Sequence, residues 1–265
     1  MGVMRSVERQ ERRPPQLGRV TSAGEVVLAF TYRPLRQDDG ILDKATDSLA
    51  ELFSDLSPHC RGRAIVEFTK EDCRHWLLLH LGDRLFDDPG LTEGVVAQQR
   101  TLLERLRRSE LRLEIASAKA CDELVHRFPH PQVEEGRVVD HHGRTVVTLR
   151  LRESGDVTRP GITRELVDYL CAQNDLAYLV LDFRNQANGL SRFDLTIVLT
   201  ATDETAGQFA AREAEEVVFN GMGALTSQDT TRRAVIGTLQ RTAPFARAFA
   251  RLPAYPANIA DLFPL

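Results

Sequence analysis

The chain is poor in aromatic residues and lacks the paired cysteines that bind zinc. Aromatic residues make up 6% of its 265 residues, with a single tryptophan. The four cysteines, Cys60, Cys73, Cys121 and Cys171, are widely spaced and form no Cys-x-x-Cys motif. This spacing argues against a zinc ribbon and against a small disulfide scaffold. We therefore expect buried thiols in a reducing cytoplasm.

Signals for membranes, secretion and nucleic acid are also absent. No apolar run of about 18 residues or more and no signal peptide are visible, so we expect a cytoplasmic protein that does not enter a membrane. The formal net charge of −4 argues against a protein built to coat nucleic acid. The basic residues are almost all arginine, a bias typical of a GC-rich genome.

The common catalytic motifs do not occur in the sequence. It has no Gly-x-Ser-x-Gly, His-Glu-x-x-His or protein-kinase pattern. The stretch "FNGMGALTS" (219–227) contains two glycines but lacks the Lys-Ser/Thr ending of a phosphate loop. The sequence therefore favours a protein without catalytic activity, and we expect no cofactor.

Histidines gather between residues 126 and 142. With Asp140 close by they offer zinc-ligating side chains, but their spacing fits no common metal site. We interpret this stretch as a solvated, titratable segment and expect no metal. The histidines are His126, His130, His141 and His142.

Hydrophobic periodicity predicts the same order of elements, β-α-β-β-α-β-α, in both halves. Alternating apolar residues indicate strands, and apolar residues spaced three and four apart indicate helices. In the first half we expect strands at 25–33, 63–69, 74–82 and 111–115, and helices at 41–56, 93–108 and 117–128. In the second half we expect strands at 144–152, 177–183, 192–200 and 234–239, and helices at 162–173, 204–219 and 243–252.

The shared order of elements indicates an internal duplication. Gly40-Ile41 aligns with Gly161-Ile162 at the start of the first helix of each half. A βαββαβ unit forms an antiparallel sheet with helices on one face, and its open face must be covered. We therefore expect an α+β fold of two ferredoxin-like βαββαβ(α) repeats, packed as an intramolecular pseudodimer that covers the open faces or extends the sheet.

The predicted domain organisation follows from this duplication. A flexible Arg-rich arm precedes the repeats, a polar linker joins them, and an apolar tail docks on the body. The ranges are 1–23 for the arm, 24–129 for the first repeat, 130–142 for the linker, 143–253 for the second repeat and 254–265 for the tail.

The start of each half also carries a family resemblance. The stretch "RPGITRELVDYLCAQNDLAYLVLDF" (159–183) resembles the strand–loop–helix entry of the ACT domain, a small-molecule-sensing module of amino-acid metabolism. The stretch "QDDGILDKATDSLAELF" (37–53) resembles it with Asp39 in place of the usual proline. The chain is thus similar to free-standing double-ACT regulators. The resemblance implies a regulatory protein without a catalytic domain.

The two glycine loops are the predicted ligand-binding sites. Gly40 and Gly161 allow a tight turn at a helix N-terminus, where free N–H groups attract a carboxylate. A small anionic metabolite, such as an amino acid, would then lie in the groove between the repeats. A simpler interpretation is that each glycine only permits the turn. The predicted contacts are Asp39, Gly40, Ile41, Arg159, Pro160, Gly161 and Ile162.

Two other functions stay open at this point. One is a small cofactor-independent enzyme of the tandem α+β-barrel type, in which His80 and either Asp72 or Glu67 form an acid–base pair in a cavity between two sheets. The other is an interaction or assembly module that uses the arm or the tail. The sequence leaves open a small-molecule ligand, a protein partner or a homo-oligomer, and it argues against nucleic acid.

Overall fold

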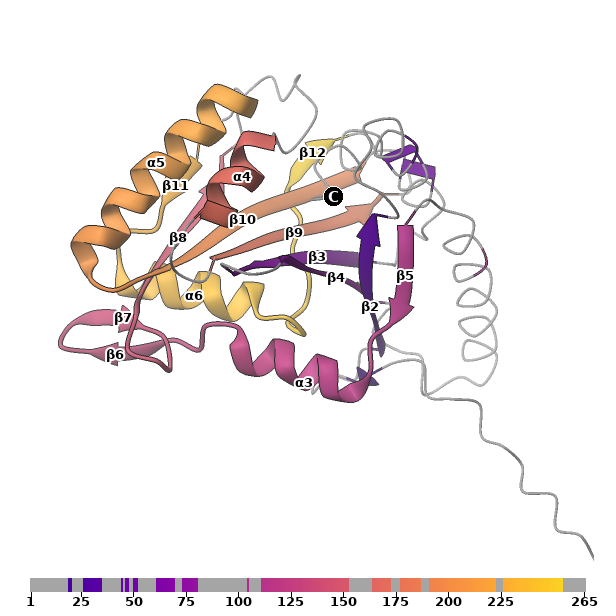
Figure 1. Ribbon diagram of the computed structural model, residues 1–265, viewed down its shortest axis with the longest axis horizontal. Coiled ribbons are helices and arrows are strands. Elements are labelled where there is room, and N and C mark those ends of the chain that lie inside the picture. Colours follow the sequence, from indigo (N-terminus) through magenta and orange to yellow (C-terminus); the bar gives the residue numbers. More distant parts are fainter. Residues whose placement is uncertain are drawn as a thin grey trace, which may run out of the picture.

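A computed structural model gives the arrangement of most of the secondary structure (Figure 1). It describes residues 19–20, 26–34, 44, 46–47, 50–51, 61–69, 73–80, 104, 111–152, 164–172, 177–186, 191–222 and 226–254. The strands are β1 (Arg19–Val20), β2 (Val26–Pro34), β3 (Arg61–Phe68), β4 (Cys73–His80), β5 (Leu111–Ile115), β6 (Gln132–Glu134), β7 (Arg137–Val139), β8 (Thr145–Leu151), β9 (Ala177–Asn185), β10 (Ser191–Ala201), β11 (Thr226–Gln228) and β12 (Leu252–Ala254). The helices are α3 (Ala118–Arg127), α4 (Arg164–Ala172), α5 (Glu204–Met222) and α6 (Arg232–Thr242).

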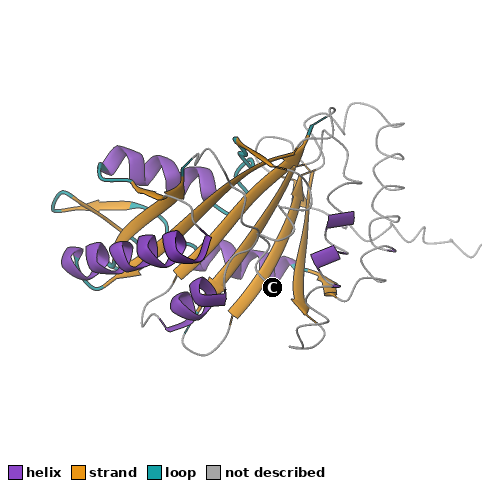
Figure 2. Cartoon of the chain, turned by 90° about the horizontal axis from the view of Figure 1, so that it is seen from above, coloured by secondary structure: helices purple, strands orange, loops and turns teal. Residues whose placement is uncertain are grey.

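These strands form one continuous antiparallel sheet, which is strongly twisted (Figure 2). Their order is β1-β2-β4-β3-β9-β10-β8-β7-β6, and β5, β11 and β12 pair with β2, β8 and β10. The first half of the chain meets the second where β3 pairs with β9, over eight residue pairs from Arg61↔Arg184 to Phe68↔Ala177. We call this β3–β9 pairing the seam.

The predicted fold class, two ferredoxin-like repeats packed as an intramolecular pseudodimer, is wrong. Over the residues that the structure describes, the strands form one large antiparallel sheet instead of two separate sandwiches. The ACT-like tandem repeat implied by the family resemblance is overturned by the same finding. The physical reason lies at the seam, because β3 and β9 are buried almost throughout and satisfy each other's backbone groups instead of remaining as exposed edges.

The two halves nevertheless occupy the sheet in a corresponding way. From the seam outward the first half contributes β3, β4, β2 and β5, and the second contributes β9, β10, β8 and β11. What the halves share is this order of strands within a common sheet. The sheet as a whole, and not either half, is therefore the packing unit.

Helices cover both faces of the sheet, as Figure 1 shows. Helices α4 and α5 lie on one face and helices α3 and α6 on the other, and each face has its own apolar core. We refer to these as the α4/α5 face and the α3/α6 face. The buried helix residues include Leu166, Leu170, Ala214 and Val218 on the α4/α5 face, and Leu124, Phe128, Val235 and Leu239 on the α3/α6 face.

Three local predictions need correction after residue 129. Residues 234–239, predicted as a strand, belong to helix α6, which begins after an N-cap at Thr231 whose hydroxyl accepts from the Ala234 N–H at 3.2 Å. Residues 243–250, predicted as a helix, have no helical structure. The predicted linker forms the β6–β7 hairpin, whose turn places Glu135 and Gly136 at positive φ, as a tight two-residue turn requires.

A buried ion pair crosses the seam on the α3/α6 face. Arg63 on β3 is 0% exposed and lies directly opposite Asp182 on β9. Its Nε and Nη2 donate to the two carboxylate oxygens at 2.6 and 2.8 Å, a bidentate arrangement. The guanidinium also donates to the backbone carbonyls of Arg241, Ala243 and Ala246. Arg63 thus joins the two halves and fixes the chain that follows α6 to the sheet.

Within the described ranges, no helix combines the length and the apolar character needed to cross a membrane.

Candidate functional site

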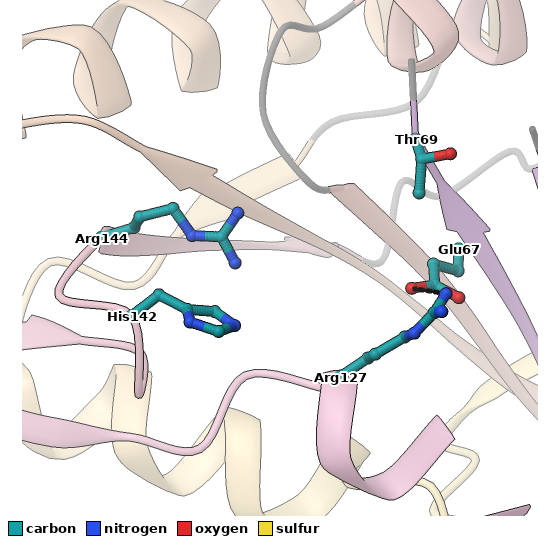
Figure 3. Close-up of a pocket in the computed structure, with 5 residues that line it drawn as sticks. All are labelled: Glu67, Thr69, Arg127, His142 and Arg144. Carbon is teal, nitrogen blue, oxygen red and sulfur yellow. Dashed lines mark ion pairs between the residues drawn. The ribbon is translucent and has the colours of Figure 1, made fainter. Parts of the chain in front are cut away.

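An open pocket lies on the α3/α6 face where β3 ends, and Figure 3 shows the side chains around it. Its volume is about 360 Å³, within the range of small-molecule sites. The lining residues come from two regions of the chain, since β3 and α3 belong to the first half and the loop before β8 leads into the second. They are Glu67, Thr69, Arg127, His142 and Arg144.

Glu67 is a buried carboxylate in the wall of this pocket. It is 1% exposed and lies opposite Tyr178 of β9 across the seam. Its Oε1 lies 3.5 Å from Nη1 of Arg127, the last residue of α3. The same oxygen accepts a hydrogen bond from the Tyr178 hydroxyl at 3.5 Å. Burial, and next the charge of Glu67, hold the pKa of Tyr178 well above its usual value, so that the phenol stays a neutral donor.

Asp140 shapes the loop that carries the other two polar residues of the pocket. Its Oδ1 accepts from the backbone N–H groups of His142 and Arg144, both at 2.9 Å, and its Oδ2 accepts from Nε of Arg144 at 2.8 Å. Gly143 closes the turn with φ +76°, a conformation that favours glycine. Asp140 is 0% exposed, so this turn is held by a buried acceptor.

The charge of Asp140 is maintained by these hydrogen bonds. Burial alone raises the pKa of Asp140, but the hydrogen bonds from Arg144 and His142 outweigh it and hold the pKa below its usual value. The carboxylate is therefore ionised at neutral pH. It stabilises the loop above the unfolded-state pKa, and this contribution is lost as the pH falls through the folded-state pKa.

The four histidines between residues 126 and 142 lie close to one another beside the pocket. The His141 ring lies 3.9 Å from that of His142, 5.6 Å from that of His126 and 5.8 Å from that of His130, measured between centroids. Burial, and then the neighbouring His142, lower the pKa of His141, which favours its neutral form. Among the described residues, no group of three or more histidines, cysteines and acids is placed to hold a metal ion.

The predicted acid–base pair between His80 and Glu67 does not form. His80 pairs with Arg61, whereas Glu67 pairs with Arg74, so six residues separate the two along β3. That offset corresponds to about 20 Å at the usual rise per residue of a strand. His80 is 1% exposed and does not line the pocket. Asp72, the other proposed partner, lies outside the described residues.

The predicted glycine-loop contacts also lie outside the described residues: Asp39, Gly40, Ile41, Arg159, Pro160, Gly161 and Ile162. Of the residues named from the sequence, Glu67 and His142 line the pocket. Arg127, Arg144 and Tyr178 were not predicted as site residues, and Asp140 was considered only as a zinc ligand. A signal was present for the Asp140 turn that carries Arg144, because an Asp followed by Gly three residues later is typical of a tight turn.

No family model and no curated protein matches the chain. Among solved structures, it is similar to CrmK, a flavoenzyme involved in the shunt product recycling mechanism in caerulomycin biosynthesis. The TM-score is 0.34 at 15% sequence identity, over 73% of this chain and 41% of that one. The chain spans less than half of the CrmK chain, and a likeness at this level assigns neither fold nor activity.

Proposed function

We propose that the chain is a binding protein for a small anionic metabolite, which occupies the pocket beside Glu67. The observation that carries this proposal is the convergence of Arg127, Arg144 and His142 on one open pocket. Guanidinium groups bind carboxylates and phosphates through paired hydrogen bonds, which makes such a pocket suited to an anionic ligand.

The arrangement within the pocket favours a ligand that carries a donor as well as an anionic group. Figure 3 shows Arg144 and His142 on one side of the pocket, and Glu67 with Arg127 on the other. Arg144 uses Nε and Nη2 to bind Asp140, and within the described part of the chain its Nη1 makes no hydrogen bond. A carboxylate or phosphate fits beside Arg144, and an ammonium or hydroxyl group fits beside Glu67. An amino acid has both kinds of group.

Replacing either pocket arginine should weaken binding of such a ligand. We expect a thermal-shift panel of amino acids, dicarboxylates, nucleotides and inorganic phosphate to contain a compound that stabilises the protein, with its affinity then measured by calorimetry. Arg127→Gln and Arg144→Gln should each weaken that affinity by roughly tenfold to a hundredfold, because a hydrogen bond to a charged group contributes about 1.5–3 kcal/mol.

The matched control is Lys119→Gln, which removes the same charge from the first turn of α3. The Lys119 side chain is 88% exposed and does not line the pocket, so its replacement should leave the affinity unchanged. Asp140 does not line the pocket, but Asp140→Asn should also weaken binding. The replacement removes the carboxylate whose hydrogen bonds hold the loop that positions Arg144. A panel without any stabilising compound, or a ligand bound equally well by both arginine variants, would contradict the proposal.

A further inference from the structure

Two cysteines from opposite halves of the chain meet on the α4/α5 face. Sγ of Cys73, the first residue of β4, lies 3.2 Å from Sγ of Cys171, in the last turn of α4. The two residues are 98 positions apart in the sequence. Their contact was not expected from the sequence, where the wide spacing of the cysteines indicated thiols without partners of their own kind.

The two cysteines pack against the core on one side and remain partly exposed to solvent on the other. Cys73 and Cys171 both pack against the apolar core of the α4/α5 face, which restrains their backbones. Both are only half-buried, so a small oxidant can reach the sulfur atoms. By contrast, Cys121 belongs to α3, is 5% exposed and packs in the core of the opposite face.

We propose that Cys73 and Cys171 are a reversible oxidation site that forms a disulfide when a hydroperoxide is present. The sulfur atoms need to approach by about 1 Å to reach the length of a disulfide bond, a shift that side-chain rotation can supply. The bond joins β4 of the first half to α4 of the second. It therefore cross-links the two halves at a place other than the seam.

The chemistry balances with hydrogen peroxide as the oxidant. One thiolate attacks a peroxide oxygen, which breaks the O–O bond, releases hydroxide and leaves a sulfenic acid. The second thiol attacks the sulfenic sulfur and displaces water, which forms the S–S bond. Two thiols and one peroxide thus give one disulfide and two waters, and the two electrons lost by sulfur reduce the peroxide. A dithiol reductant reverses the reaction by thiol–disulfide exchange.

Thiol counting and peptide mapping test the proposal on the full chain. One equivalent of hydrogen peroxide should remove two of the four titratable thiols, and digestion should yield a single peptide pair linked through Cys73 and Cys171. The oxidised protein should melt several degrees higher than the reduced one, because the bond closes a long loop in the unfolded chain. Dithiothreitol should restore both the thiols and the original melting temperature.

Three variants separate this site from general oxidation. Cys73→Ser and Cys171→Ser should each abolish the linked peptide and the rise in melting temperature, whereas Cys121→Ser should retain both. Mapping of the unmodified chain gives an answer even where a variant does not fold. A cross-link through Cys60 or Cys121, a cross-link between two molecules, or oxidation of Cys73 beyond sulfenic acid without a linked peptide would overturn the assignment.

Discussion

Arg63→Met should lower the free energy of unfolding by about 3–5 kcal/mol, the usual loss when one partner of a buried ion pair is removed. The carboxylate of Asp182 is 2% exposed and would remain in the interior without its bidentate donor. The backbone carbonyls of Arg241, Ala243 and Ala246 would lose a donor at the same time. Urea or thermal unfolding, followed by circular dichroism, measures the effect.

A second replacement distinguishes the ion pair from the three carbonyl contacts. Arg63→Met combined with Asp182→Leu removes both charges, so its cost should be smaller than the sum of the two single replacements. It should still exceed zero, because the carbonyls of Arg241, Ala243 and Ala246 stay without a donor. Lys119→Gln, which breaks an exposed 3.9 Å contact with Glu123, should change stability by less than about 1 kcal/mol. A loss below about 1 kcal/mol for Arg63→Met would show that the pair does not hold the two halves together.

Gly62→Ala should destabilise the protein by about 1–3 kcal/mol, the usual cost of overpacking a core. Gly62 on β3 lies opposite Phe183 on β9, and a Cβ at this position would overlap the Phe183 ring. The ring is 1% exposed within the core of the α4/α5 face, so moving it disturbs neighbouring core residues. Chemical denaturation of the purified variant gives the change in the free energy of unfolding.

A glycine elsewhere in the chain is the matched control. Gly237 lies inside α6, is exposed, and would place a Cβ near no other atom, so Gly237→Ala should stabilise the protein by about 0.5–1 kcal/mol. Phe183→Leu should recover part of the loss in the Gly62→Ala background, since the smaller side chain leaves room for the methyl group. If Gly62→Ala were neutral or stabilising, the close contact across the seam would not exist.

The strands of this fold could largely be predicted from sequence, because alternation is a local property. The structure has strands at 26–34, 61–68, 73–80, 177–185 and 191–201, close to the segments expected from their apolar pattern. The segment "AVIGTL" (234–239) misled because its β-branched residues suit a strand. The buried residues of α6 recur three and four apart, which is the spacing typical of a helix. They are Val235, Thr238, Leu239 and Thr242.

The pairing of strands could not be predicted in the same way. Two strands far apart in the sequence can pair through their backbone groups whatever their side chains are. The side-chain pattern of β3 or of β9 alone therefore does not show that the two strands pair. The pocket depends on that contact. Glu67 was proposed with His80, but the register of β3 on β4 separates those two residues, and the register on β9 places Tyr178 beside Glu67 instead.

Native-state hydrogen exchange at the seam tests the central claim, that the two halves form one cooperative sheet. If they do, the hydrogen-bonded amides of β3 and β9 should exchange only through global unfolding, with a free energy of opening equal to that of the whole chain. Amides of the short outer strands β6 and β7 should exchange more easily. Opening of β3 and β9 at a lower free energy than the strands on either side of them would show instead that the halves are separate units.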